Sequence, residues 1–146
     1  MDNPFVMEQC YKAPIEKVWA ALTHENHMRA WYFPQLEKFQ PVVGFAFEFV
    51  ADNSPYQKDW RVTQVEKEKK LAHSWQYKGY AGGSEVTFEL VAEGAGTRLK
   101  LTHSGLASFP PDPHFARSRF EAGWQRILGS NLKYYLEKNL DNLTSR

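Results

Sequence analysis

Two histidines stand where the sequence would allow proton chemistry. His73 and His103 each take a position at which the alternation of a β-strand calls for an inward apolar side chain. Imidazole titrates near neutral pH and burial shifts its pKa further, so either ring is a candidate general acid or base inside a cavity. The other interpretations are a ring held by hydrogen bonds to backbone carbonyls and a polar contact for a ligand. The sequence favours the structural role, and we assign no catalytic residue.

Motifs for other kinds of chemistry are absent from the sequence. It contains no glycine-rich phosphate loop, no His-Glu-x-x-His motif and no serine nucleophile elbow. His24 and His27 are three residues apart and suit a shared metal ion, but the sequence places no third ligand near them. We therefore expect no metal ion and no cofactor, and we favour a protein without catalytic activity.

Aromatic residues form the candidate binding surface. They make up 15% of the chain, with 5 Trp, 10 Phe and 7 Tyr. Each ring taken alone fits a solid core, but Trp, Tyr and His on the same inner face as Phe are typical of an apolar pocket with a few orienting hydrogen bonds. The predicted ligand-binding residues are Trp31, Phe47, Trp60, His73, Trp75, Tyr77, Phe88, His103, Phe109, Phe120 and Trp124.

Length and charge exclude several classes of partner. A chain of 146 residues fits one domain, residues 1–146. Because 18 Lys and Arg balance 17 Asp and Glu, no field is expected that would attract nucleic acid or a lipid surface. The chain has neither a signal peptide nor a stretch long enough to span a membrane, and its single Cys10 allows no internal disulfide. We expect a cytoplasmic protein.

The elements that must position these residues can be predicted from their periodicity. A strand over residues 5–12 precedes a helix that begins at Pro14 and a short second helix within residues 24–34. Alternating residues then predict strands over 45–50, 60–66, 71–77, 86–90 and 99–103, with a bulge between Trp60 and Val65. Glycines at 82–83 and 94–96 predict hairpin turns, and so an antiparallel meander with one wet face.

A long amphipathic helix is the strongest signal, and it determines the architecture. A stripe of mostly apolar residues, which also includes the polar Asn131, follows the 3.6-residue period from Phe120 to Leu136. Only this helix is long enough to cover the apolar face of the sheet. The prediction is an α+β fold, a curved antiparallel sheet wrapped around a long C-terminal helix, with two short helices after the first strand. A cavity is expected between sheet and helix, with residues 78–80 and 109–111 at its mouth.

Segments along nearly the whole chain together resemble a known family. They are Ala13–Thr23, Leu71 with Trp75, Glu85–Leu90, Thr97–Gly105 and Gly123–Leu136. The sequence is similar to the single-domain bacterial proteins grouped with the activator of heat-shock protein 90 ATPase, in the START and birch-pollen-allergen superfamily. This resemblance implies a helix-grip fold around a hydrophobic cavity. The co-chaperone members have a further N-terminal domain, whereas this chain begins at its first strand, which argues against chaperone activation.

Three hypotheses about function arise from these observations. The first is a binding protein, linked to stress, that holds a small apolar ligand of aromatic or lipid-like character. The second is an enzyme of the cyclase or dehydratase type with His73 or His103 as its acid or base. The third is a protein-interaction module with a chaperone partner, for which Val42, Val43 and the loop near Leu106 supply an apolar surface. Edge strands also leave a homodimer open.

Overall fold

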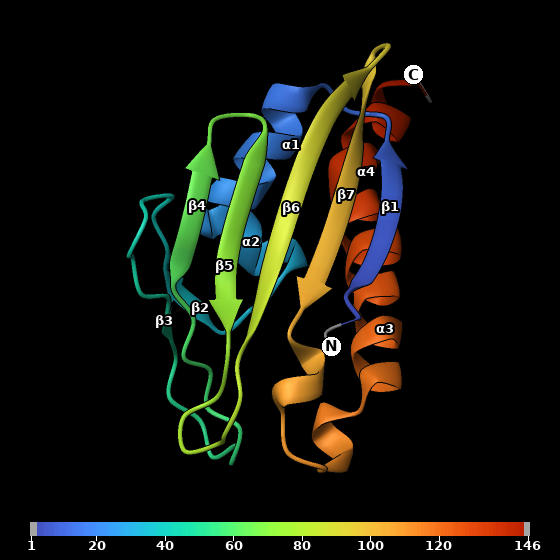
Figure 1. The fold of residues 1–146 in the computed structure, drawn as a ribbon. Helices are drawn as coiled ribbons and strands as arrows, with labels where there is room; N and C mark the ends of the chain where they lie inside the picture. Colours follow the sequence, from blue (N-terminus) through green and yellow to red (C-terminus); the bar gives the residue numbers. More distant parts are fainter. Residues whose placement is uncertain (1–2, 145–146) are drawn as a thin grey trace.

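Five antiparallel strands form the main sheet of the molecule (Figure 1). The computed structural model describes residues 3–144, and the strand order in this sheet is β1-β7-β6-β5-β4. The strands are β1 (Phe5–Tyr11), β4 (Val62–Glu66), β5 (Lys70–Trp75), β6 (Ser84–Glu93) and β7 (Gly96–Ser104). The strands from β4 to β7 form the predicted meander, and β1 adds to its far edge by pairing with β7.

The two faces of this sheet differ as the alternation predicted. On the inner face Val86 of β6 is the cross-strand partner of both His73 and His103, so the two histidines lie in one row with a valine between them. All three side chains are fully buried. On the outer face Arg98 bridges Glu8 at 2.8 Å and Glu93 at 2.7 Å, which keeps that face charged and wet.

Helices cover the inner face. The two predicted short helices follow the first strand as α1 (Ile15–Thr23) and α2 (Glu25–Trp31), and Pro14 stands directly before α1. Two single-turn 3-10 segments, η1 (Leu106–Ser108) and η2 (Pro113–Phe115), lead into the C-terminal helix. Figure 1 shows α1 and α2 behind the sheet and the C-terminal helix along its β7 and β1 side. The predicted α+β arrangement of a curved antiparallel sheet around this helix is confirmed.

The C-terminal helix changes its winding midway. It runs as α3 (Arg117–Arg126), a π-helical segment η3 (Ile127–Leu132) and α4 (Lys133–Thr144). Every fourth residue is buried in the series Phe120, Trp124, Leu128, Leu132 and Leu136. In an α-helix such a spacing drifts around the axis by about 40° at each step. The wider π turn offsets part of that drift.

The π-helical segment explains why one residue of the predicted apolar stripe was placed wrongly. Asn131 is exposed, and Leu132 takes the buried position beside it. The 3.6-residue period assumed for the whole helix does not hold where the hydrogen bonds reach one residue further. Within the same segment the carbonyl of Leu128 accepts a hydrogen bond from the hydroxyl of Tyr11 at 2.7 Å, which ties the helix to β1.

The chain between α2 and β4 is less regular than predicted. The strand expected over residues 45–50 is only Glu48–Phe49 (β3), which pairs with β2 (Leu36–Lys38) in a separate ribbon. Residues 44–47 run beside β4 with one isolated bridge, between Ala46 and Arg61. The register of β4 shifts between Val62 and Gln64, which confirms the predicted bulge and bends this edge away from a regular ladder.

The two glycine turns differ. The tight turn at residues 94–95 joins β6 to β7 as predicted, whereas residues 76–83 form a long connection instead of a hairpin at 82–83. Gly82 has φ +88°, and a Cβ there would lie 2.3 Å from the carbonyl oxygen of Ser108. The Ser108 hydroxyl accepts from the backbone N–H of Gly83 at 2.9 Å. The connection is therefore fixed to η1.

Candidate functional site

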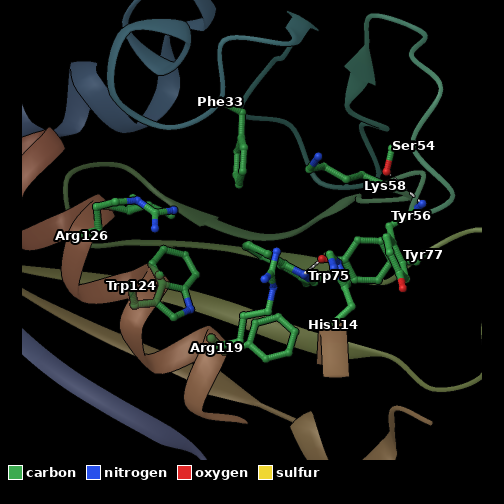
Figure 2. Close-up of a pocket in the computed structure, with 13 residues that line it drawn as sticks. Phe33, Ser54, Tyr56, Lys58, Trp75, Tyr77, His114, Arg119, Trp124 and Arg126 are labelled. Carbon is green, nitrogen blue, oxygen red and sulfur yellow. Dashed lines mark hydrogen bonds between the residues drawn. The ribbon is translucent and has the colours of Figure 1, made fainter. Parts of the chain in front are cut away.

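A pocket of about 210 Å³ opens between α3 and the chain around the end of β5 (Figure 2). Its walls come from four parts of the sequence: the end of α2, the segment before β4, the end of β5, and the turns from η2 to η3. The lining residues are Phe33, Ser54, Tyr56, Lys58, Trp75, Tyr77, His114, Arg119, Phe120, Gly123, Trp124, Arg126 and Ile127.

Four of the predicted ligand-binding residues belong to this wall. They are Trp75, Tyr77, Phe120 and Trp124. Trp75 ends β5, and its indole N–H donates to the hydroxyl of Tyr77 at 2.9 Å. The rings of Trp75 and Trp124 lie 5.5 Å apart and those of Trp75 and Phe120 lie 6.1 Å apart, so strand and helix meet through aromatic contacts. Contact with a ligand remains a prediction for all four.

The other seven predicted residues do not line this pocket and pack in the core. They are Trp31, Phe47, Trp60, His73, Phe88, His103 and Phe109. Trp60 lies directly behind the wall, with its ring centroid 4.0 Å from that of Trp75 and 5.1 Å from that of His73. These rings thus occupy space under the sheet that was expected to be open, and the pocket described here lies at the end near α3. Their role in ligand binding also stays a prediction.

Hydrogen bonds determine which nitrogen of His103 carries the proton. The indole N–H of Trp124 donates to His103 Nδ1 at 3.0 Å, and indole is a donor only, so Nδ1 is the unprotonated nitrogen. His103 Nε2 then donates to the Ser84 hydroxyl at 2.8 Å, and that hydroxyl donates to the carbonyl of Trp75 at 2.8 Å. Burial, with a smaller effect of His73, lowers the pKa of His103 to about 3.

Both ring nitrogens of His73 are also engaged. Nδ1 donates to the carbonyl of Ser74 at 2.8 Å, which leaves Nε2 to accept from the hydroxyl of Tyr32 at 3.0 Å. Burial lowers the pKa of His73 to about 4, although the bond to Ser74 acts in the opposite direction. Both histidines are therefore neutral at pH 7, and neither ring offers a free nitrogen to a molecule in the pocket.

The pair His24 and His27 shows no geometry of a metal site. Their ring centroids lie 5.6 Å apart at right angles, and the His27 ring bonds to the hydroxyl of Tyr135 through Nδ1. Across the described part of the chain, no group of three or more His, Cys, Asp or Glu side chains is placed to hold a metal ion.

Several lining residues were missed by the sequence reasoning. Lys58 forms an isolated antiparallel bridge with Tyr77, which fixes it beside the end of β5. No periodicity marks a residue in such an irregular segment. Arg119, Gly123 and Arg126 do carry a signal, because their spacing of four and three residues places them on one face of a helix. That face adjoins the apolar stripe, so these three residues could have been predicted from the sequence to line the helical side of the pocket.

Tyr56 and His114 close one side of the pocket as a stacked pair. Their ring centroids are 3.6 Å apart and the rings are within 3° of parallel. Asp112 holds both residues: its carboxylate accepts from the Tyr56 hydroxyl at 3.1 Å and from the backbone N–H of His114 at 2.8 Å. Burial is the largest of the effects that lower the pKa of His114.

The mouth of the pocket differs from the prediction. Neither residues 78–80 nor residues 109–111 line it. Phe109, Pro110 and Pro111 line a separate depression at the surface, beside η2. The ring of Phe109 stacks 5.1 Å from that of Phe115, which packs this loop inward instead of leaving it as a lid.

No helix among residues 3–144 has the length and apolar character needed to cross a bilayer.

Comparisons with known proteins place these features in context. A family model described as activator of Hsp90 ATPase homolog 1-like protein matches residues 12–137. Among solved structures, protein MLL2253 from Mesorhizobium loti is 30% identical, with 96% of this chain and 98% of that chain covered and a TM-score of 0.70. Comparison with curated proteins gave no match.

Two further solved structures cover most of the chain. CalU16 from Micromonospora echinospora is 26% identical over 92% of this chain and 74% of that chain, with a TM-score of 0.70. The Aha1 dimer from Colwellia psychrerythraea is 25% identical over 92% of this chain and 96% of that chain, with a TM-score of 0.71.

Proposed function

This chain belongs to the activator of Hsp90 ATPase homolog 1-like family, and from the pocket we propose that it binds a small, largely apolar ligand of aromatic or lipid-like character. The observation that carries this proposal is an open space walled by aromatic side chains of β5 and α3. An apolar cavity of about 150 Å³ suffices for benzene. The 210 Å³ found here suit a ligand of one or two rings, or a short acyl chain.

Gly123 keeps this space open. It lies in the wall of the pocket, in the middle of α3, and a Cβ at this position would have no atom within 4 Å. Glycine weakens a helix by about 1 kcal/mol relative to alanine, so its place here has a cost in stability. Room for a ligand is a reason for a helix to carry a glycine at a point where packing does not require one.

Filling the pocket from Gly123 tests the proposal. The neutral dye N-phenyl-1-naphthylamine, whose fluorescence rises in apolar surroundings, serves as the probe; its two fused rings match the pocket volume, and its third ring can stay at the open side. We expect the natural chain to bind it and Gly123→Leu to lose at least tenfold in affinity, because the leucine side chain occupies the ligand volume. Gln125→Leu is the matched control, since residue 125 is exposed on the same helix and lies outside the pocket.

The outcomes of this experiment are distinct. Bound dye that is displaced by small aromatic or acyl compounds, and that is lost only in Gly123→Leu, supports the proposal. Equal binding by both leucine variants would place the dye elsewhere on the protein and contradict the proposal. Absence of binding by the natural chain, for the dye and for a library of apolar compounds alike, would also contradict it.

The cyclase or dehydratase alternative depended on His73 or His103. Both rings are buried behind the wall with both nitrogens bonded to protein groups, so a ligand in the pocket meets neither of them. A general acid or base must reach the proton that it transfers, directly or through one water. Ligand binding is therefore the function that this geometry supports best.

The interaction hypothesis keeps part of its basis. Val42 and Val43 are 55% and 62% exposed, whereas Leu106, in the other loop expected to supply apolar surface, is buried at 7% exposure. The Colwellia psychrerythraea relative forms a dimer, and the edge strands of the present sheet would permit the same. Five expectations stay predictions: self-association, a chaperone partner, a link to stress, a single domain over residues 1–146 and a cytoplasmic location.

A further inference from the structure

The charged side chains that line the pocket are all of one sign. Lys58, Arg119 and Arg126 contribute to the wall, and no Asp or Glu does. The whole chain carries a formal net charge of only +1, so this excess is local and does not reflect a basic protein. The aromatic wall of the pocket thus has cations around it.

None of these cations forms an ion pair with an acid among residues 3–138, whose side chains the structure describes, although Asp52 acts on Lys58 at longer range. The ion pairs found there involve other residues. Glu121, next to Phe120 in the sequence, pairs with Arg117 at 2.7 Å, and two further acids near the pocket accept hydrogen bonds. Asp112 accepts from Tyr56 and from the backbone of His114, and Asp52 accepts from the Gln57 side chain at 2.8 Å.

Lys58 is the cation whose position is least favourable without an anion. It is half-buried, and its Nζ lies 5.1 Å from the ring centroid of Phe33 and 5.4 Å from that of Phe49. Cation–π contacts of this kind offset part of the loss of hydration. Burial lowers the pKa of Lys58 in spite of the opposing effect of Asp52. A negative charge in the pocket would favour the charged ammonium.

The two arginines approach the same space from the helix. Arg119 and Arg126 are seven residues apart, with Gly123 between them on the same face of α3. Figure 2 shows their guanidinium groups extending from α3 toward the space below Phe33, while Lys58 enters from the opposite side. A guanidinium presents a fork of N–H donors that matches the two oxygens of a carboxylate.

We infer that the ligand is an amphipathic anion, an apolar ring or chain carrying a carboxylate that Arg119, Arg126 and Lys58 bind at the rim of the pocket. This inference rests on the proposed function, because it names the chemical class of the ligand in the same site. The apolar part packs against Trp75, Trp124 and their neighbours, and the carboxylate stays at the cationic side. Arginine contacts then orient the ligand with its polar end toward solvent.

A pair of compounds that differ only in charge tests the inference. 2-Naphthoate and 2-naphthamide have the same two rings and nearly the same size, but only the first is an anion at pH 7.5. We expect isothermal titration calorimetry to show about tenfold tighter binding of the naphthoate, in line with the added strength of hydrogen bonds between charged groups. Raising the salt concentration should weaken naphthoate binding and leave the amide unchanged.

Variants assign the effect to named residues. The double variant Arg119→Gln/Arg126→Gln and the single variant Lys58→Met should remove most of the preference for the naphthoate, measured in each variant as the ratio of naphthoate affinity to 2-naphthamide affinity. Arg98→Gln is the control for net charge, because Arg98 lies on the outer face of the sheet with its ion-pair partners Glu8 and Glu93. It should retain the full preference.

The possible results separate this inference from the proposed function. If both compounds bind equally well to the natural chain, the pocket binds apolar ligands and the inference of an anion is wrong. If the preference persists in the Lys58→Met and arginine variants, the carboxylate is bound elsewhere and the inference is also wrong. If neither compound binds while the neutral dye also fails, the proposed function fails together with it.

Discussion

The indole N–H of Trp124 donates to Nδ1 of His103 at 3.0 Å, and this bond joins the wall of the pocket to the buried face of the sheet. Its direction requires an unprotonated Nδ1, so the neutral state of the histidine is built into the contact between α3 and β7. A proton on that nitrogen would set two N–H donors against each other. The same pair of residues thus links the stability of the fold to the shape of the site.

Acid should destabilise the fold at a pH well above the range in which carboxylates titrate. Unfolded histidines take up protons below about pH 6.5, whereas burial holds the pKa of His73 to about 4 and that of His103 to about 3. The unfolded state therefore binds more protons throughout this interval, and stability is lost as pH falls from 6.5 toward 4. We expect the free energy of unfolding to decrease with a slope that approaches about 2.7 kcal/mol per pH unit near pH 5, from these two histidines.

Urea unfolding between pH 8 and pH 5 measures this dependence. The free energy should be nearly constant above pH 7, where both histidines are neutral in either state. A profile that stays flat down to pH 5 would show that neither ring has a lowered pKa in the folded protein.

Removing His103 should destabilise the protein and weaken its response to acid. In His103→Phe the ring keeps its place in the core, but the indole N–H of Trp124 loses its acceptor and stays buried. An unpaired buried donor costs about 1–3 kcal/mol. We expect that loss at pH 8 and, below pH 6, a slope that is smaller by up to about 1.4 kcal/mol per pH unit, because residue 103 no longer titrates. An unchanged slope would mean that His103 does not cause the acid sensitivity.

Tyr56 should control how fast a ligand leaves the pocket. Its ring stacks on His114 at 3.6 Å and forms part of the wall. Tyr56→Ala removes this side of the wall, so we expect the dissociation rate of N-phenyl-1-naphthylamine to rise about tenfold, as affinity changes within one site appear mostly in the dissociation rate. Stopped-flow fluorescence measures it.

Tyr56→Phe is the matched variant for this experiment. It keeps the stack and loses only the hydroxyl bond to Asp112. The dissociation rate should stay within about threefold of the natural chain, because the ring that forms this side of the wall is retained. Equal rates for the alanine and phenylalanine variants would show that the ring itself does not retain the ligand.

Alanine substitutions at two glycines with similar backbone φ angles should lower the stability of the protein by different amounts. Gly44 and Gly82 have φ +93° and +88°, so a side chain is strained at both. A Cβ at Gly44 has no neighbour within 4 Å, whereas a Cβ at Gly82 would overlap the Ser108 carbonyl at 2.3 Å. We expect Gly44→Ala to cost about 1 kcal/mol and Gly82→Ala at least about 1–3 kcal/mol more. Thermal unfolding of the pair gives the difference, and equal costs would contradict the close contact with η1.

The sequence alone was sufficient for the elements whose periodicity extends over several residues. The alternation through His73 and Trp75, and again through Leu99 and His103, identified the inner face of the meander. It also placed the bulge beside Val62. The π-helical segment was not predictable, because a change of winding leaves only a subtle shift from a spacing of 3.6 residues toward four.

The site was predictable only in part, for a physical reason. Periodicity shows that Trp75 and Trp60 both face inward, but both are large rings, and only packing determines which of them borders open space. Lys58 lies in an irregular segment whose position depends on its bridge to Tyr77, a contact between residues distant in the sequence. Arg119 and Arg126 could have been found from the sequence, because they lie four residues before and three residues after Gly123 and so share its face of the helix.

The widened turns at Ile127–Leu132 bear on which length changes the protein tolerates. A π turn is equivalent to one inserted residue in an α-helix, and each residue rotates the remainder of the helix by about 100°. Deleting one residue there would restore uniform α-winding and leave Leu136 facing the core, whereas winding the present number of residues as α-helix would turn it away by about 100°. The π winding of this segment therefore keeps the pocket-lining half of the helix in phase with the half that anchors it.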